Sequence, residues 1–143
     1  MRFSMIDDVL QEKLESLRRS LERVRLKMPL SVEILASDLD AQDIVTLNLE
    51  RSVQSCVDIA LHVLASRTIA PPKTMAEAFT LLASEQLITD ATATRMVKAV
   101  GFRNLAVHAY RKIDWAIVYA IGTTHLDDFR AFMREIVAAV GPD

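Results

Sequence analysis

The chain has 143 residues, of which 17 are Lys or Arg and 19 are Asp or Glu, so its formal net charge is −2; half of it is apolar, with 3 Gly and 4 Pro. This length predicts one domain spanning residues 1–143, and so few Gly and Pro residues favour a helical globule over a disordered chain or a Gly-rich β protein. The slightly negative charge excludes a protein whose entire surface binds nucleic acid.

The first predicted helix ends before Pro29, because proline has no amide hydrogen and cannot continue a helix. Its apolar residues recur at alternating steps of four and three, at Leu10, Leu14, Leu17, Leu21, Val24 and Met28. This spacing is typical of a helix that packs lengthwise in a helical bundle, and we call this apolar row the seam of the helix. Residues 1–15 become acidic and helical too early for a secretory signal, and no stretch reaches the roughly 18 to 20 apolar residues that span a bilayer. We therefore expect a cytoplasmic location with no membrane contact.

A second helix is expected to begin near Asp40 to Asp43, whose carboxylates suit a first turn, and to run to about Arg67. Its inner face is marked by Leu49, Val53, Cys56, Val57, Ala60, Leu61 and Leu64. Cys56 is the only cysteine, which excludes an internal disulfide and a thiol cluster for a metal. Its apolar neighbours predict a small buried side chain.

The remaining pattern predicts further helices. Thr74 and Glu77 form a capping-box pattern that opens a third helix, which runs to about Glu85. Thr89 or Asp90 caps a fourth, which carries the following basic segment and can bend at Gly101. One short and one longer helix follow in the segments DWAIVYAIG and LDDFRAFMREIVAAV. With no strand or repeat pattern, the sequence predicts an all-α, up-and-down bundle of about five helices.

The fourth predicted helix contains an acid-free segment between Asp90 and Asp114. Its five basic residues are Arg95, Lys98, Arg103, Arg111 and Lys112. The segment carries +5, so the rest of the chain carries −7 to reach the net −2. Such a local patch indicates a confined anionic ligand, with Lys98, Arg111 and Lys112 as candidate phosphate-binding residues. The alternative is a solvated helix face beside acidic neighbours.

Within this segment, RNLAVHAY (residues 103–110) gathers four polar side chains in eight positions. On a continuous helix that turns about 100° per residue, Asn104, His108 and Arg111 share one face. Arg103 and Tyr110, which are seven residues apart, lie on a second face beside it. A bundle helix that gives so much of its circumference to polar groups is not using that sector for its own core, which predicts a site.

These residue types support only a few kinds of reaction. Histidine can accept and donate a proton near neutral pH, arginine holds a phosphate and the charge that develops on it, and asparagine can orient either partner. No Ser or Cys nucleophile and no carboxylate cluster with metal-ligand spacing accompany them. The set fits a metal-free reaction at phosphorus in which the substrate supplies the nucleophile, as RNA does with its 2′-hydroxyl.

The segment FRNLAVHAYRKID (Phe102 to Asp114) resembles the R-N-x-x-x-H-x-Y signature of the HepT toxins, a branch of the HEPN superfamily of small helical ribonucleases. Arg103, Asn104, His108 and Tyr110 match it position for position. Upstream, ERSVQSCVDIALHVL (residues 50–64) resembles the second helix of that family. The resemblance implies a HEPN-like fold over nearly the whole chain.

The same resemblance implies a metal-independent endoribonuclease toxin of a type II toxin–antitoxin pair, which cleaves RNA through its 2′-hydroxyl without a cofactor. His108 would be the acid–base group, Arg103 would steady the phosphate and Asn104 would support the site. Tyr110 would accept AMP from an MntA-type nucleotidyltransferase antitoxin. Family members pair two chains so that two motifs line one cleft, which implies a homodimer.

Other interpretations stay open from the residues alone. The chain could be a catalytically idle HEPN module that binds a nucleotidyltransferase or nucleic acid, or a purely structural helical adaptor. Of the two histidines outside the motif, His62 is expected to be partly buried and structural, and His125 to face solvent or cap a helix. Trp115 and Tyr119 are expected in the core or in a dimer interface.

Overall fold

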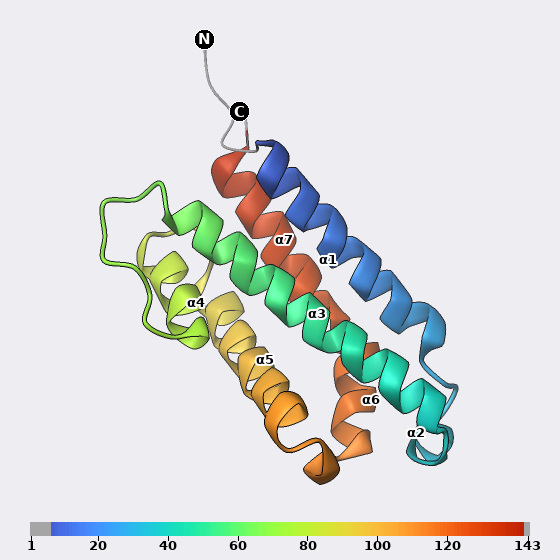
Figure 1. The fold of residues 1–143 in the computed structure, drawn as a ribbon. Coiled ribbons are helices and arrows are strands. Elements are labelled where there is room, and N and C mark those ends of the chain that lie inside the picture. Colours follow the sequence, from blue (N-terminus) through green and yellow to red (C-terminus); the bar gives the residue numbers. More distant parts are fainter. Residues whose placement is uncertain (1–6, 142–143) are drawn as a thin grey trace.

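The computed structural model describes residues 7–141, and within that range its regular elements are all helices, without strands (Figure 1). The elements are α1 (Asp8–Lys27), α2 (Val32–Ser37), α3 (Leu39–Leu64), α4 (Met75–Ser84), α5 (Asp90–His108), the 3₁₀-helix η1 (Tyr110–Lys112), α6 (Trp115–Thr123) and α7 (Leu126–Val140). The all-α bundle is thus confirmed, with seven α-helices in the described range instead of about five. Helix α6 is the short helix expected in DWAIVYAIG, whereas α2 was not predicted. None of the helices in the described range is long and apolar enough to cross a membrane.

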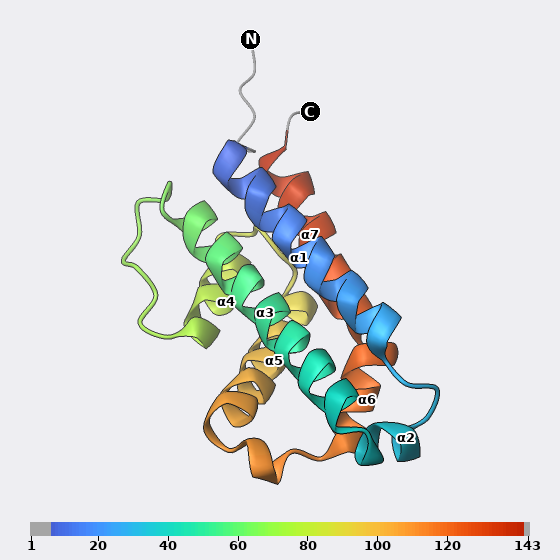
Figure 2. The same cartoon turned by 45° about the vertical axis from the view of Figure 1, so that its right-hand side comes forward.

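Helix α3 lies at the centre of the bundle. In both views α1 and α7 run along one side of it, and α4 and α5 lie on the other (Figures 1 and 2). The pair α1 and α3 shares the most extensive helix contact. The short helices α2 and α6 sit at the end of the bundle opposite the start of α1 (Figure 2). Helix α5 packs most extensively against α4 and also contacts α3 and α7, which leaves the rest of its surface open.

The seam of α1 is buried as its spacing predicts. Leu10, Leu14, Leu17, Leu21 and Val24 are each at most 4% exposed, and Met28 packs against the core while partly accessible. The helix ends at Lys27, and Met28 already has extended backbone angles, so the stop at Pro29 is confirmed. This seam packs along α3 and supplies the main apolar contact of the fold.

Helix α3 begins close to its predicted start, at Leu39, and Asp40 lies in its first turn as expected. Asp38 caps the helix by accepting a hydrogen bond from the Ala41 amide at 3.1 Å. The helix ends at Leu64, three residues before Arg67. The predicted inner face is buried except for Leu61, which is 43% exposed.

Three predicted buried or capping features are confirmed. Cys56 is completely buried, and burial raises the pKa of its thiol, which keeps it unreactive. Thr74 caps α4 by accepting a hydrogen bond from the Glu77 amide at 3.1 Å. Thr89 caps α5, which then continues through Gly101 as one helix as far as His108.

Candidate active site

Helix α5 ends inside the RNLAVHAY segment. Ala109 leaves the helical region with φ −146° and ψ 50°, although its amide still donates to the Leu105 carbonyl at 2.8 Å. Tyr110 and Arg111 then belong to η1. The expectation that one continuous helix carries all four motif residues and Arg111 is therefore wrong, and the helical faces assigned to Tyr110 and Arg111 do not exist.

Tertiary contacts account for this helix end, because the sequence has no Gly or Pro between Gly101 and Gly122 to stop a helix. The Tyr110 hydroxyl donates a hydrogen bond to Asp43 Oδ1 of α3 at 2.9 Å. Its ring packs edge-on against Trp115, with centroids 5.9 Å apart and planes at 70°. These two contacts turn the chain toward α3 and the start of α6.

The structure places Arg103, Asn104 and His108 on α5, in its last two turns. Arg103 is half-buried, and its Nη1 donates to Asn104 Oδ1 at 3.3 Å, which leaves further guanidinium donors for a ligand. His108 is exposed in the final turn. Five residues on a helix correspond to a rotation of about 140°, so Arg103 and His108 point in different directions from one chain.

Helix α3 brings acidic groups to the flank of this site. Burial raises the pKa of Glu50, and the positive charge of nearby Arg103 partly offsets that rise. Asp43, Thr46 and Glu50 are spaced by three and four residues, so they form one stripe along α3. Thr46 is buried, and its hydroxyl has no hydrogen-bond partner among the described residues.

The sequence analysis missed this stripe, because it counted acidic residues only along the basic segment itself. The signal was available in the spacing of Asp43 and Glu50, seven residues apart on a helix expected to pack in the same bundle. The basic segment is acid-free along the chain but faces two carboxylates in space.

The pKa of the Tyr110 hydroxyl is shifted from its ordinary value. Burial, followed by the hydrogen bond and negative charge of Asp43, raises the pKa of Tyr110 to about 12, while the nearby Thr46 hydroxyl acts in the opposite direction. The side chain is 37% exposed. Tyr110 is thus partly accessible, and its hydroxyl is engaged by Asp43.

The five basic residues separate into different environments. Arg95 lies 3.7 Å from Asp128, measured from Nε to Oδ1, so α7 neutralises part of its charge. Lys98 is exposed on the flank of α5 that faces α6 and α7. Arg111 and Lys112 are exposed on η1, directly after His108. Positive charge is therefore available at the motif end of α5 and, separately, beside Lys98.

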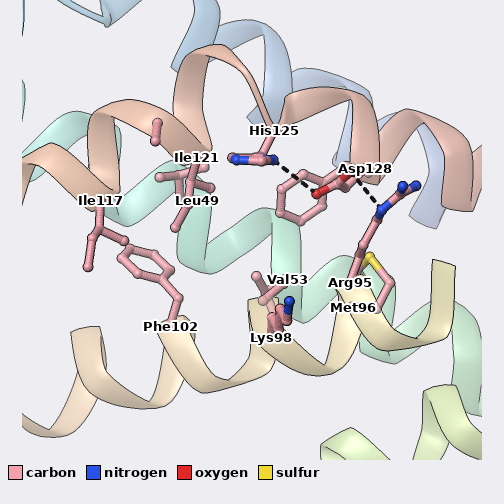
Figure 3. Close-up of a pocket in the computed structure, with 13 residues that line it drawn as sticks. Leu49, Val53, Arg95, Met96, Lys98, Phe102, Ile117, Ile121, His125 and Asp128 are labelled. Carbon is pink, nitrogen blue, oxygen red and sulfur yellow. Dashed lines mark ion pairs between the residues drawn. The ribbon is translucent and has the colours of Figure 1, made fainter. Parts of the chain in front are cut away.

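A pocket of about 400 Å³ opens beside Lys98, between α3, α5, α6 and α7 (Figure 3). Phe102 and Ile117 face each other at one end of it (Figure 3). Its other apolar lining residues are Leu49, Val53, Met96, Ala99, Ala120, Ile121 and Phe129. At the opposite end His125 Nδ1 lies 3.6 Å from Asp128 Oδ2. The pocket combines apolar walls with a partly basic rim, on a different flank of α5 from the one that faces Glu50.

The two histidines outside the motif have the structural roles expected of them. His62 is partly buried, and its Nε2 lies 3.0 Å from Asp7 Oδ2 at the start of α1. His125 is exposed before α7 and makes no side-chain capping bond. Between residues 7 and 141, no three His, Cys, Asp or Glu side chains gather closely enough to hold a metal ion.

Comparisons with known proteins agree with this fold. Residues 10–136 match the family described as ribonuclease HepT-like. A protein of Shewanella oneidensis named mRNA nuclease HepT is 33% identical over 133 residues, which cover 93% of this chain and 99% of that one. A protein of Aphanizomenon flos-aquae named tRNA nuclease HepT is 27% identical over 128 residues, which cover 90% of this chain and 87% of that one.

Solved structures extend the likeness to the fold. A tri-AMPylated Shewanella oneidensis HEPN toxin, in complex with an MNT antitoxin, superposes with a TM-score of 0.87 at 33% identity, over 93% of this chain and 99% of that one. A toxin–antitoxin structure with AMP-PNP gives the same TM-score at 32% identity, over 92% and 99%. Both curated relatives are nucleases, which agrees with the expected endoribonuclease class. The chain belongs to the ribonuclease HepT-like family.

Proposed function

We propose that this chain is a metal-independent endoribonuclease toxin of a toxin–antitoxin pair, which acts in the cytoplasm. His108 exchanges protons with the 2′-hydroxyl and the leaving oxygen of RNA, and Arg103 stabilises the charge that develops on the phosphate. The related nucleases act on mRNA or tRNA by name, and they support RNA as the substrate class.

The observation that carries this proposal is the accessible state of both groups. His108 is exposed in the last turn of α5, and Arg103 is oriented by Asn104 while keeping donors for a phosphate. Arg111 and Lys112 follow on η1 and add positive charge at the same end of the helix, where an RNA backbone would lie. A module without catalytic activity would have no chemical need for both an arginine and an exposed histidine at these positions.

A homodimer would complete the site. Arg103 and His108 diverge by about 140° on one helix, so a cleft forms more readily between two copies of the motif than within one. The polar strip of Asn104 and His108 is flanked by Leu105 and Val107, which are 39% and 46% exposed. A two-fold contact that buries these apolar groups brings the motifs face to face. Sedimentation of active protein as a monomer at micromolar concentration would exclude this arrangement.

A nucleotidyltransferase antitoxin would silence the toxin by attaching AMP to Tyr110. The solved relative is tri-AMPylated and bound to an MNT antitoxin, which supports this class of partner. A phosphodiester at Tyr110 puts negative charge and bulk two residues from His108, where it repels RNA. After reaction with the antitoxin and ATP, intact-mass analysis is expected to show adenylate on the wild type and none on Tyr110→Phe.

The central experiment is cleavage of RNA in the presence of a chelator. The wild type is expected to cut at an unchanged rate, whereas Arg103→Ala should lose on the order of a hundred-fold because it lacks the charge that stabilises the transition state. Lys73→Ala, which removes an exposed cation from the loop before α4, is the control and should cut normally. Inhibition by the chelator would contradict the metal-free mechanism. A wild type that binds its antitoxin but cuts no RNA would favour the idle-module alternative.

A further inference from the structure

The contact between Tyr110 and Asp43 is the starting point. It joins residues 67 positions apart in sequence, from η1 and α3, with a hydroxyl-to-carboxylate distance of 2.9 Å. Packing of the ring against Trp115 fixes the phenol from a second direction. The hydroxyl of Tyr110 therefore has a defined position and a defined proton acceptor before any partner binds.

The phenol cannot act as a nucleophile while it keeps its proton. Because burial and Asp43 raise the pKa of Tyr110 to about 12, only about one molecule in 10⁵ carries a phenolate at pH 7. A preformed phenolate is thus too rare to be an efficient route. The proton must leave as the new bond to phosphorus forms, and the acceptor must already touch the hydroxyl.

We propose that Asp43 is the general base for AMP transfer to Tyr110, a role that rests on Tyr110 being the acceptor in the proposed function. Tyr110 Oη attacks the α-phosphorus of the ATP that the antitoxin holds, and the bond from that phosphorus to the bridging oxygen of the pyrophosphate breaks. The phenolic proton passes to Asp43 Oδ1, and pyrophosphate leaves with the electron pair of the broken bond. The modified toxin then carries an aryl adenylate diester.

The neighbouring groups favour Asp43 over any other residue of this chain as the acceptor. Glu50 also acts on Tyr110, but only through its charge, and it makes no hydrogen bond to the phenol. Thr46 lies on the same stripe, and its buried hydroxyl has no hydrogen-bond partner within residues 7–141. It can donate to Oη as negative charge develops there, so Asp43 removes the proton while Thr46 steadies the oxygen.

The product also has a consequence for η1. After transfer the tyrosine oxygen has no hydrogen to donate, and the diester places a negative charge beside the carboxylates of Asp43 and Glu50. Like charges at this distance repel, so the modified side chain moves away from α3. Modification would thereby both block the RNA path and release the contact that ends α5 at His108.

The test is single-turnover AMP transfer from ATP by the cognate antitoxin at saturating concentration, followed by intact-mass analysis. Asp43→Asn keeps the size and the hydrogen-bond acceptor of the side chain but cannot take the proton. Its transfer rate is expected to fall about a hundred-fold or more. Asp40→Asn, one turn earlier on α3 and exposed, is the matched control and should react at the wild-type rate.

The pH profile separates a base from a merely structural contact. The wild-type rate should change little with pH around neutrality, because Asp43 removes the phenolic proton during the transfer. The Asp43→Asn rate should keep rising tenfold per pH unit, because it depends on the rare phenolate, so the two rates converge at high pH. Cleavage of RNA by unmodified Asp43→Asn should remain normal, which shows that the variant is folded.

Three results would overturn the proposal. A wild-type transfer rate for Asp43→Asn would mean that the antitoxin supplies the base, and an equal loss at all pH values would mean that Asp43 only positions the phenol. Adenylate on Tyr110→Phe would instead show that the acceptor lies elsewhere. That last result contradicts the proposed function itself, so the two failures are distinguishable.

Discussion

The two ends of helix α5 have opposite surroundings. At its start, Thr92, Ala93 and Met96 are buried, and Glu135 of α7 accepts hydrogen bonds from the Thr89 amide, at 2.6 Å, and from the Thr92 hydroxyl. In its last two turns Asn104, Leu105, Val107 and His108 are exposed, and only Ala106 is buried. A single helix thus joins a packed anchor to an open end.

This contrast indicates how the fold separates stability from chemistry. The anchor holds α5 through apolar burial and two charge-assisted hydrogen bonds, neither of which involves a residue of the motif. The open end retains groups that contribute little to packing and are free to contact a ligand. Substitutions in the first region should therefore lower stability, and substitutions in the second should lower activity.

The strongest challenge to this separation is His108→Ala. Loss of the acid–base group is expected to reduce RNA cleavage by about a thousand-fold or more, while the exposed site leaves the midpoint of thermal unfolding unchanged. His125→Ala removes the other well-exposed histidine and should cleave RNA normally. Cleavage rates under single-turnover conditions and circular dichroism melts provide the two readouts. If His108→Ala unfolds at lower temperature in step with its loss of activity, the open end is part of the packing after all.

The converse variant is Met96→Ala, at the anchored end. Met96 is completely buried, so the truncation should lower the free energy of unfolding by about 2 to 5 kcal/mol. Val97→Ala, the neighbouring residue with 37% exposure, should cost less than about 1 kcal/mol. Denaturant unfolding measures both. Folded Met96→Ala protein should still cut RNA. If cleavage falls by more than the unfolded fraction of the protein accounts for, the separation of stability from activity along α5 is contradicted.

The anchored regions of the fold could be predicted because their signals are local. The α1 seam follows from spacing alone, and the caps Thr74 and Thr89 follow from side chains three residues before the amides that they bind. The start of α3 could be predicted without its cap. Asp40 lies in the first turn as expected, and only the backbone shows that Asp38 has the extended conformation of a cap.

The candidate site could be predicted in its residues but not in its geometry. The spacing of Arg103 and His108 identifies the motif, and their position on one helix is observed. The end of that helix depends on Tyr110 meeting Asp43, a contact between residues 67 apart that has no local signature. A continuous helix was therefore the natural interpretation. The spacing of Asp43 and Glu50 indicates a stripe on α3, but only the packed structure shows that this stripe faces the basic segment.

A smaller effect is expected from the cations of η1. Arg111→Ala and Lys112→Ala should each weaken binding of single-stranded RNA several-fold and reduce the slope of log affinity against log salt by about 0.7, the value for one lost phosphate contact. The measurement uses the His108→Ala background, so that RNA stays intact during titration. Lys98→Ala shows whether the cation beside the pocket belongs to the same RNA path. Unchanged salt slopes in both η1 variants would remove this segment from the RNA-binding surface.

The smallest expected effect concerns Glu135, which fastens the anchored end of α5. Burial by itself would raise the pKa of Glu135, but hydrogen bonds from Thr92 and Thr89 outweigh it and lower the pKa below its ordinary value of 4.5. The folded state therefore binds a proton at Glu135 less readily than the unfolded state does. The contribution of Glu135 to stability is complete above its ordinary pKa, and it is lost as the pH falls through the pKa of the folded state. Glu135→Gln should be less stable than the wild type at pH 7 by about 1 kcal/mol or less, since the group is partly solvated. The difference should shrink as the pH falls through the lowered pKa of Glu135, which denaturant unfolding at a series of pH values measures. Glu12→Gln, on the exposed side of α1, is the surface control. If the stability difference between the wild type and Glu135→Gln persists undiminished at acid pH, it arises from packing of the side chain, and the charge of Glu135 does not contribute to the anchor.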